Sequence, residues 1–171
     1  MKACFGLEAG VRIGPLVNDA ALEKVDRQVQ DTVKKGAELV AGGRTLTENG
    51  LDRGHLYAPT ILKNVTTDMT IYREETFGPV APIISYQNEE DLLSMANDTN
   101  YGLASCAYTR DLKKAFTLFE GLHFGIFGIN DINPTSAAEP FGGMKESGLV
   151  REESMEGIDE YLETKIGSFS V

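Results

Sequence analysis

The chain contains 171 residues, 42% of them apolar, and its 26 acidic and 16 basic side chains give a formal net charge of −10. This length allows one sizeable hydrophobic core, whereas the acidic balance argues against nucleic-acid binding, which needs clustered lysine and arginine. Apolar runs stay below the roughly 20 residues of a membrane helix, and the start does not resemble a signal peptide. We therefore expect a soluble, cytoplasmic protein without a nucleic-acid or membrane partner.

The first predicted element is an amphipathic helix over residues 19–35. Asp19 is suited to cap this helix and Gly36 to end it. Apolar side chains recur at helical spacing between these two residues, at Leu22, Val25, Val29 and Val33. Residues 37–41 then have the composition of a strand that runs into the Gly42-Gly43 turn.

Beyond an aperiodic loop over residues 44–55, apolar strand-like runs alternate with helices. The runs are 80–86, 103–108 and 125–129, and the helices are 89–96 and 111–120. The second helix has an apolar face and ends at Gly121; the face consists of Leu112, Ala115, Phe116 and Phe119. Strands separated by helices of about ten residues predict right-handed crossovers. The expected fold is α/β, with a mostly parallel sheet and flanking helices.

The last part of the chain has a different pattern. Residues 161–166 alternate between two faces, as in a terminal strand, but no sheet with a free edge is evident for this strand to join.

A short segment before the run 80–86 combines two carboxylates, Glu74 and Glu75, with the ring of Phe77 and a Gly-Pro turn. A carboxylate on such a turn can accept both hydroxyls of a ribose, and a nearby ring can pack on a flat heterocycle. The same residues also fit two solvated acids with Phe77 in the core, and physical reasoning alone favours that second interpretation.

A second glycine-rich segment covers residues 140–148. It lacks the spacing of phosphate-binding loops, so glycines that let the backbone turn tightly around a neighbouring segment explain it better.

The sequence offers no metal site and no activated thiol. His55 and His123 have no carboxylate or cysteine at ligand spacing. Cys106 has apolar neighbours in the predicted strand, which argues against a thiolate nucleophile, and Cys4 lies at an N-terminus that we expect to fray.

Five ordered motifs resemble the aldehyde dehydrogenase superfamily, and the resemblance covers residues 6–165. The motifs are Gly14–Val17, Glu74–Val80, Asn100–Ala104, Gly128–Asn130 and Pro140–Gly148. The family oxidises aldehydes to acids through a thiohemiacetal on a cysteine, with NAD or NADP as hydride acceptor and a glutamate that activates water. In the family, that cysteine and that glutamate both precede the region that matches Gly14–Val17. The resemblance therefore implies that this chain contains no catalytic residue and lacks the cofactor-binding domain.

The resemblance also assigns secondary roles. It implies that Glu75 holds the nicotinamide-side ribose and that Phe77 packs beside the nicotinamide, while Asn130 and Phe141 border the substrate tunnel. It divides the chain into a part of the catalytic domain, 1–157, and an oligomerisation strand and tail, 158–171. A homo-oligomer formed through this strand would explain why the strand lacks a partner.

Within the superfamily, residues 74–82 and 157–165 look most like succinic semialdehyde dehydrogenases. In that group a serine in the loop before the Pro-Phe-Gly-Gly sequence helps bind the carboxylate of the substrate, and Ser136, next to Thr135, takes that place. Val150 departs from the family, which usually has glycine there, and would be strained if the position needs a positive φ.

Two hypotheses follow. The chain is a piece of an aldehyde-oxidising enzyme, or it is a non-catalytic module that associates with full-length subunits through its terminal strand.

Overall fold

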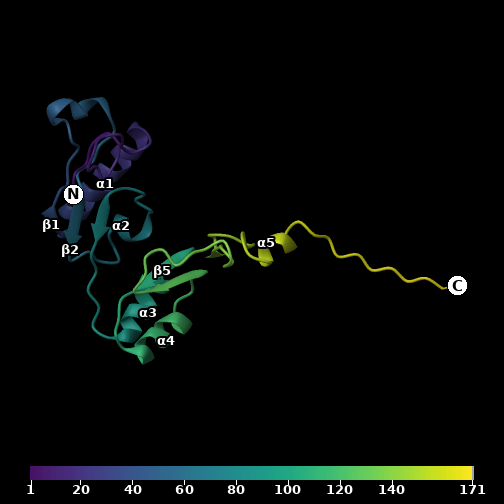
Figure 1. Ribbon diagram of the computed structural model, residues 1–171. Helices are drawn as coiled ribbons and strands as arrows, with labels where there is room; N and C mark the ends of the chain where they lie inside the picture. Colours follow the sequence, from purple (N-terminus) through teal and green to yellow (C-terminus); the bar gives the residue numbers. More distant parts are fainter. Residues whose placement is uncertain (171) are drawn as a thin grey trace. The chain divides into compact units, whose positions relative to one another are not determined.

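The computed structural model describes residues 1–170, which form two compact units that divide between Gln87 and Asn88 (Figure 1). Each unit combines short strands with helices, which confirms the α/β class. Among the described residues, no helix is both long and apolar enough to span a membrane.

The first unit contains a three-stranded sheet. Its elements are α1 (Asp19–Lys34), β1 (Glu38–Ala41), a 3₁₀ helix (Glu48–Arg53), β2 (Thr60–Lys63), α2 (Thr70–Arg73) and β3 (Val80–Pro82). The strand β2 pairs antiparallel with β1 and parallel with β3. The sequence pattern predicts neither β2 nor α2, which lie between the loop over residues 44–55 and the predicted run 80–86.

The helix α1 confirms the helix predicted over residues 19–35. Its cap is Asn18, one residue before Asp19, because the Asn18 side chain accepts a hydrogen bond from the Ala21 N–H at 2.9 Å. At the other end Gly36 has a φ of +105°, a left-handed conformation that glycine adopts without steric cost.

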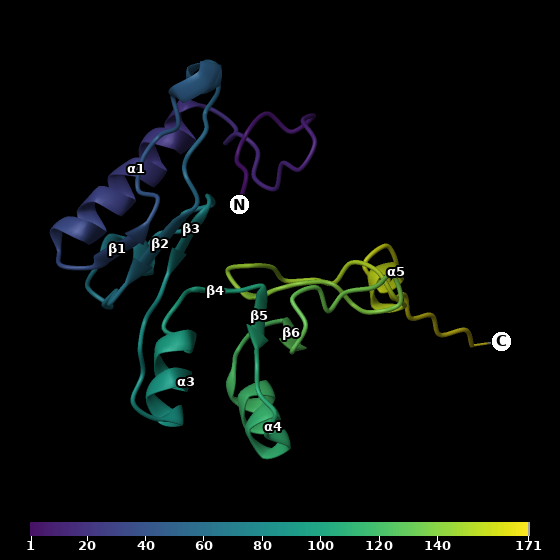
Figure 2. The same cartoon turned by 60° about the vertical axis from the view of Figure 1, so that its left-hand side comes forward.

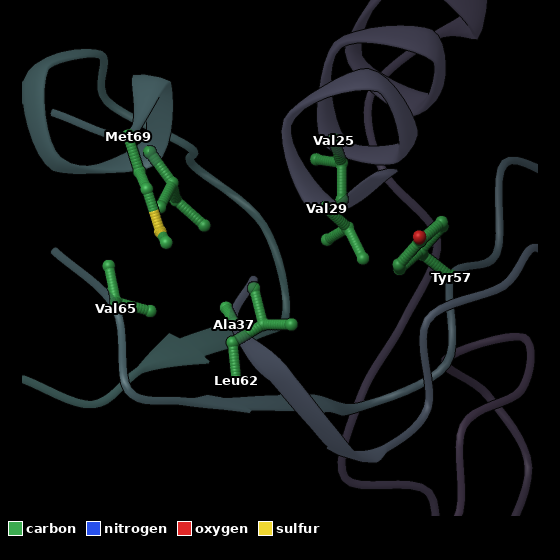
Figure 3. Close-up of a cluster of buried hydrophobic side chains, with 8 residues drawn as sticks. Val25, Val29, Ala37, Tyr57, Leu62, Val65 and Met69 are labelled. Carbon is green, nitrogen blue, oxygen red and sulfur yellow. The ribbon is translucent and has the colours of Figure 1, made fainter. Parts of the chain in front are cut away.

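The core of the first unit lies between α1 and one face of the sheet. Figure 3 shows Val25 and Val29 of α1 pointing toward the same interior as Leu62 of β2 and Tyr57, and all four are buried. The remaining buried members of this cluster are Ala37, Val65, Met69 and Ile71. Burial alternates along β2, with Leu62 inward and Ile61 outward, as expected for a sheet covered on one face.

The second unit is built around a strand–helix–strand crossover. Its elements are α3 (Glu89–Asn97), β4 (Tyr101–Gly102), β5 (Ala104–Ala107), α4 (Leu112–Gly121), β6 (Ile126–Ile129), β7 (Met144–Lys145) and α5 (Glu156–Asp159). The strands β5 and β6 lie side by side and parallel (Figure 2), whereas β4 pairs antiparallel with β7. The predicted parallel pairing is thus present in β2–β3 and β5–β6, although the strands form three small sheets.

The apolar face predicted for α4 does not pack into a core. Leu112, Phe116 and Phe119 are 72%, 58% and 59% exposed, while Leu118 is buried. The rings of Phe119 and of Phe127 in β6 are tilted by 51°, with 5.8 Å between their centroids. The apolar side of α4 also includes Leu118, and helical spacing alone does not determine which edge of that side faces the adjacent strands.

The C-terminal tail follows α5 without pairing to any described strand. Figure 1 shows it as an extended segment, and Tyr161, Ile166 and Phe169 are each about nine-tenths exposed. The strand predicted over residues 161–166 therefore has no sheet within the described chain to join.

Candidate functional site

The Glu74–Val80 turn connects α2 to β3 in the first unit. Glu74 is the C-cap of α2, and its N–H donates to the Thr70 carbonyl at 2.9 Å. At the far end, the Pro79 carbonyl accepts from the Thr60 N–H at 2.8 Å, which ties the turn to β2. The backbone of the turn is thus fixed on both sides.

The structure distinguishes the two acids of this turn. The Gln28 amide of α1 donates from Nε2 to Glu74 Oε2 at 3.3 Å. Glu75 is exposed and makes no hydrogen bond or ion pair within residues 1–170. The Glu75 carboxylate is thus wholly unpaired within residues 1–170, whereas one oxygen of the Glu74 carboxylate is engaged by α1.

Phe77 projects from the turn into solvent, with 79% of its surface exposed and a φ of +46°. A left-handed φ at a bulky residue costs on the order of 1 kcal/mol and is maintained only by its surroundings. Gly78 provides that constraint, because a Cβ at this position would lie 2.6 Å from Val25 Cγ2 and 3.6 Å from Leu16 Cδ2. The interpretation that Phe77 fills the core is wrong, since the adjacent glycine occupies the contact with α1.

This turn can bind a ribose and a flat ring. An unpaired carboxylate accepts hydrogen bonds from neighbouring hydroxyls, and an exposed aromatic ring two residues away can pack on a heterocycle. The residues present therefore fit a nicotinamide nucleotide. Leu16 of the Gly14–Val17 motif also packs against the core cluster, so two of the five sequence motifs meet at this position.

Asn130 lies in the second unit, at the end of β6, with a φ of +55°. Its amide makes two hydrogen bonds to the backbone of Thr109: Oδ1 accepts from N–H at 3.0 Å and Nδ2 donates to the carbonyl at 2.9 Å. These bonds join the chain after β5 to the end of β6. The amide is thus engaged in fixing the start of the following loop.

Ser136 and Phe141 lie on that loop. Ser136 is exposed, and its hydroxyl has no hydrogen-bond partner among the described residues, while its carbonyl accepts from the Glu139 N–H at 2.9 Å. Phe141 is half-buried and exchanges two backbone hydrogen bonds with Glu152, at 2.9 and 2.7 Å. The loop is therefore fixed at its two ends and presents the Ser136 hydroxyl between them.

The glycines of the 140–148 segment allow close packing, as predicted. A Cβ on Gly142 would lie 2.6 Å from the Val150 carbonyl oxygen, and one on Gly125 would lie 1.9 Å from the Gly142 oxygen. Val150 itself does not have a positive φ, so the strain expected for a non-glycine residue there is absent. The Ser147 hydroxyl accepts from the Gly102 N–H at 2.9 Å, which ties this segment to β4.

The two cysteines differ in environment. Cys4 is buried, and the hydrogen bond from its thiol to Glu8, 2.8 Å away, raises the thiol pKa above its usual value. Cys106 is exposed on β5.

Within residues 1–170 no group of three histidine, cysteine or acidic side chains is arranged to hold a metal ion. His55 Nε2 lies 3.1 Å from Asp19 Oδ1, and this contact links the loop before β2 to the start of α1.

Gln28 is a residue of the site that the sequence interpretation missed. It lies three residues after Val25 on the buried stripe of α1, where an apolar side chain is expected. A polar side chain within an apolar stripe is the signal that would have indicated it.

Comparison with known proteins finds that the chain is similar to aldehyde dehydrogenases. The model of the aldehyde dehydrogenase family matches residues 2–166. The NADP(+) succinate-semialdehyde dehydrogenase of Escherichia coli K12 is 45% identical over 160 residues, which are 94% of this chain and 32% of that protein. The glutarate-semialdehyde dehydrogenase of Pseudomonas putida is 42% identical over 171 residues, which are 100% of this chain and 34% of that protein.

A solved structure of the same kind of enzyme also superposes on this chain. The crystal structure of succinate-semialdehyde dehydrogenase from Burkholderia pseudomallei superposes with a TM-score of 0.85 at 44% identity, covering 91% of this chain and 32% of that one. The chain therefore spans about a third of the length of the relatives that it matches.

The position of Asn130 leads to a first prediction. Asn130→Gly keeps the left-handed φ but removes both bonds to Thr109, so we expect the free energy of unfolding to fall by about 1–2 kcal/mol. Asn130→Ala should cost about 1 kcal/mol more because alanine disfavours that φ. Urea unfolding followed by circular dichroism measures both variants, with the exposed Asn133→Ala as control. Wild-type stability in both variants would show that the two hydrogen bonds between Asn130 and Thr109 do not stabilise the fold.

Proposed function

This chain belongs to the aldehyde dehydrogenase family, and we propose that it forms the C-terminal part of an NAD(P)-dependent enzyme that oxidises a semialdehyde to its carboxylic acid. The observation that carries the proposal is the Glu74–Val80 turn, which presents one free carboxylate and one exposed ring. The relatives named for succinate and glutarate semialdehydes support the substrate class.

In this proposal the turn binds the nicotinamide half of the cofactor. The Glu75 carboxylate accepts hydrogen bonds from the ribose hydroxyls, and the Phe77 ring packs beside the nicotinamide. The bound cofactor would accept the hydride released on aldehyde oxidation. The turn itself keeps these two groups in place, since its backbone is held by α2 and β2.

The loop after β6 binds the substrate. The Ser136 hydroxyl, beside Thr135, donates a hydrogen bond to the carboxylate of the semialdehyde, and Phe141 borders the substrate tunnel. Asn130 contributes by holding the start of the loop through its two bonds to Thr109. We thus assign Asn130 a positioning role in place of direct contact with the aldehyde.

The nucleophile and the water-activating base are supplied from outside these 171 residues. Cys4 is unsuited to nucleophilic attack, because its raised pKa keeps the thiol protonated at neutral pH. Cys106 is exposed on β5, and no hydrogen bond joins its thiol to a base within residues 1–170.

The purified chain should therefore show no turnover of succinic semialdehyde with NAD or NADP, because both the covalent step and the proton transfer lack their groups. Spectrophotometry of reduced cofactor measures this directly. Turnover that disappears when Cys106 or Cys4 is replaced by serine would contradict the proposal. Tight binding of NAD in calorimetry would equally contradict it, because the proposed chain holds only the nicotinamide side.

We also propose that the tail mediates assembly into a homo-oligomer. The segment after α5 has exposed Tyr161, Leu162 and Ile166, and no backbone hydrogen bond within the described chain engages residues 163–170. Its free backbone groups can therefore pair with the edge of another subunit's sheet. The unpaired state of this segment in the described chain supports the proposal.

Deletion of residues 159–171 should lower the oligomeric state while leaving thermal stability nearly unchanged, because the exposed tail makes few core contacts. Analytical ultracentrifugation compares the two forms, and a Tyr161→Ser/Ile166→Ser double variant serves as a matched control at full length. A monomeric full-length chain whose residues 161–166 are protected from hydrogen exchange would contradict assembly through the tail.

A further inference from the structure

The inward face of α1 contains one residue that does not fit an apolar core. Val25, Gln28, Val29 and Thr32 are all completely buried. The Thr32 hydroxyl satisfies itself locally by donating to the Gln28 carbonyl at 2.6 Å. The Gln28 amide has no such local partner, so its burial needs another explanation.

The contacts of the Gln28 amide leave it only half satisfied. Nε2 donates to Glu74 Oε2, while Oε1 has no hydrogen-bond partner within residues 1–170. An unsatisfied buried polar atom is destabilising, whereas leucine has a similar size and carries no polar atom. The amide therefore weakens the core locally. Its hydrogen bond to Glu74 is the favourable contact that explains why a polar side chain stands here.

That hydrogen bond holds one end of the turn, and a neighbouring residue of the same helix holds the other. Gln28 contacts Glu74, and Val25, one helical turn earlier, closes against Gly78. One face of α1 thus contacts the turn before and after Phe77.

The geometry of Glu74 explains why the next acid is free. Glu74 has φ −100° and ψ 132°, an extended conformation in which consecutive side chains point to opposite sides. When Gln28 holds the Glu74 carboxylate toward α1, the Glu75 carboxylate is directed away from α1. Both acids are exposed, so the distinction between them rests on the hydrogen bond between Glu74 and Gln28.

We infer that Gln28 is a positioning residue, which fixes the turn through Glu74 and thereby leaves Glu75 as the carboxylate that meets a ribose. The anchoring follows from contacts within the first unit. The identity of the ligand rests on the proposed function.

The anchoring is tested by amide hydrogen exchange, measured by NMR on the whole chain. The reporters are the N–H groups of Glu74 and Thr60, whose hydrogen bonds to Thr70 and Pro79 bracket the turn. Gln28→Leu should accelerate exchange at both about fivefold, the effect of losing one such bond. Global stability should be unchanged or higher, because the unsatisfied Oε1 is removed.

Variants of Glu74 separate positioning from simple packing. Glu74→Ala should accelerate exchange as Gln28→Leu does, and the double variant should go no further. Glu74→Gln retains an acceptor oxygen and should restore wild-type exchange, and Glu75→Ala should leave it unchanged. Unchanged exchange in Gln28→Leu, or equal and additive effects of the two single variants, would overturn the inference.

A second measurement concerns the ligand. Titration with nicotinamide mononucleotide should shift the NMR signals of Phe77 in the wild type, with at least threefold weaker binding in Gln28→Leu and loss in Glu75→Ala. Equal binding by wild type and Gln28→Leu would contradict the positioning role. Absence of binding to the wild type, with the exchange results as expected, would contradict the proposed function and leave the anchoring supported.

Discussion

The packing of one face of α1 against the rest of the first unit determines both its core and its candidate site. Val25 and Val29 close the hydrophobic cluster over β2, and the same stripe reaches the Glu74–Val80 turn through Val25 and Gln28. Because interiors are close-packed, the position of the turn is as fixed as the helix itself. The backbone that carries Glu75 and Phe77 is therefore held in one conformation, although both side chains extend into solvent.

Most of the recognisable motifs of the second unit serve packing. Gly128 allows the Asp131 carbonyl oxygen to approach, since a Cβ there would lie 2.2 Å from it, and Gly142 does the same for Val150. Asn130 and Ser147 use their side chains to bind backbone groups of neighbouring segments. These motifs identify the fold because they encode tight contacts, whereas Glu75, Phe77 and Ser136 present groups to solvent.

The sequence predicts the parts of this protein in which a long period or a clear boundary exists. The helix from 19 to 34, the crossover β5–α4–β6 and the tight glycine contacts all follow from spacing and turn residues. Features decided by tertiary contact do not follow. Helical spacing cannot tell that Leu118 and not Phe116 is buried, and two adjacent acids cannot be distinguished until Gln28 is seen to hold the first. The exposure of Phe77 likewise depends on Val25, which lies far away in sequence.

We propose that these 171 residues form the part of a semialdehyde dehydrogenase that completes its cofactor and substrate sites. A chimera tests it most directly, in which this chain replaces the matching third of the Escherichia coli succinate-semialdehyde dehydrogenase. We expect NADP-dependent oxidation of succinic semialdehyde, with a raised KM for NADP in the Glu75→Gln chimera and a raised KM for the aldehyde in the Ser136→Ala chimera. A folded chimera that binds neither NADP nor aldehyde, or whose kinetics ignore both substitutions, would contradict it.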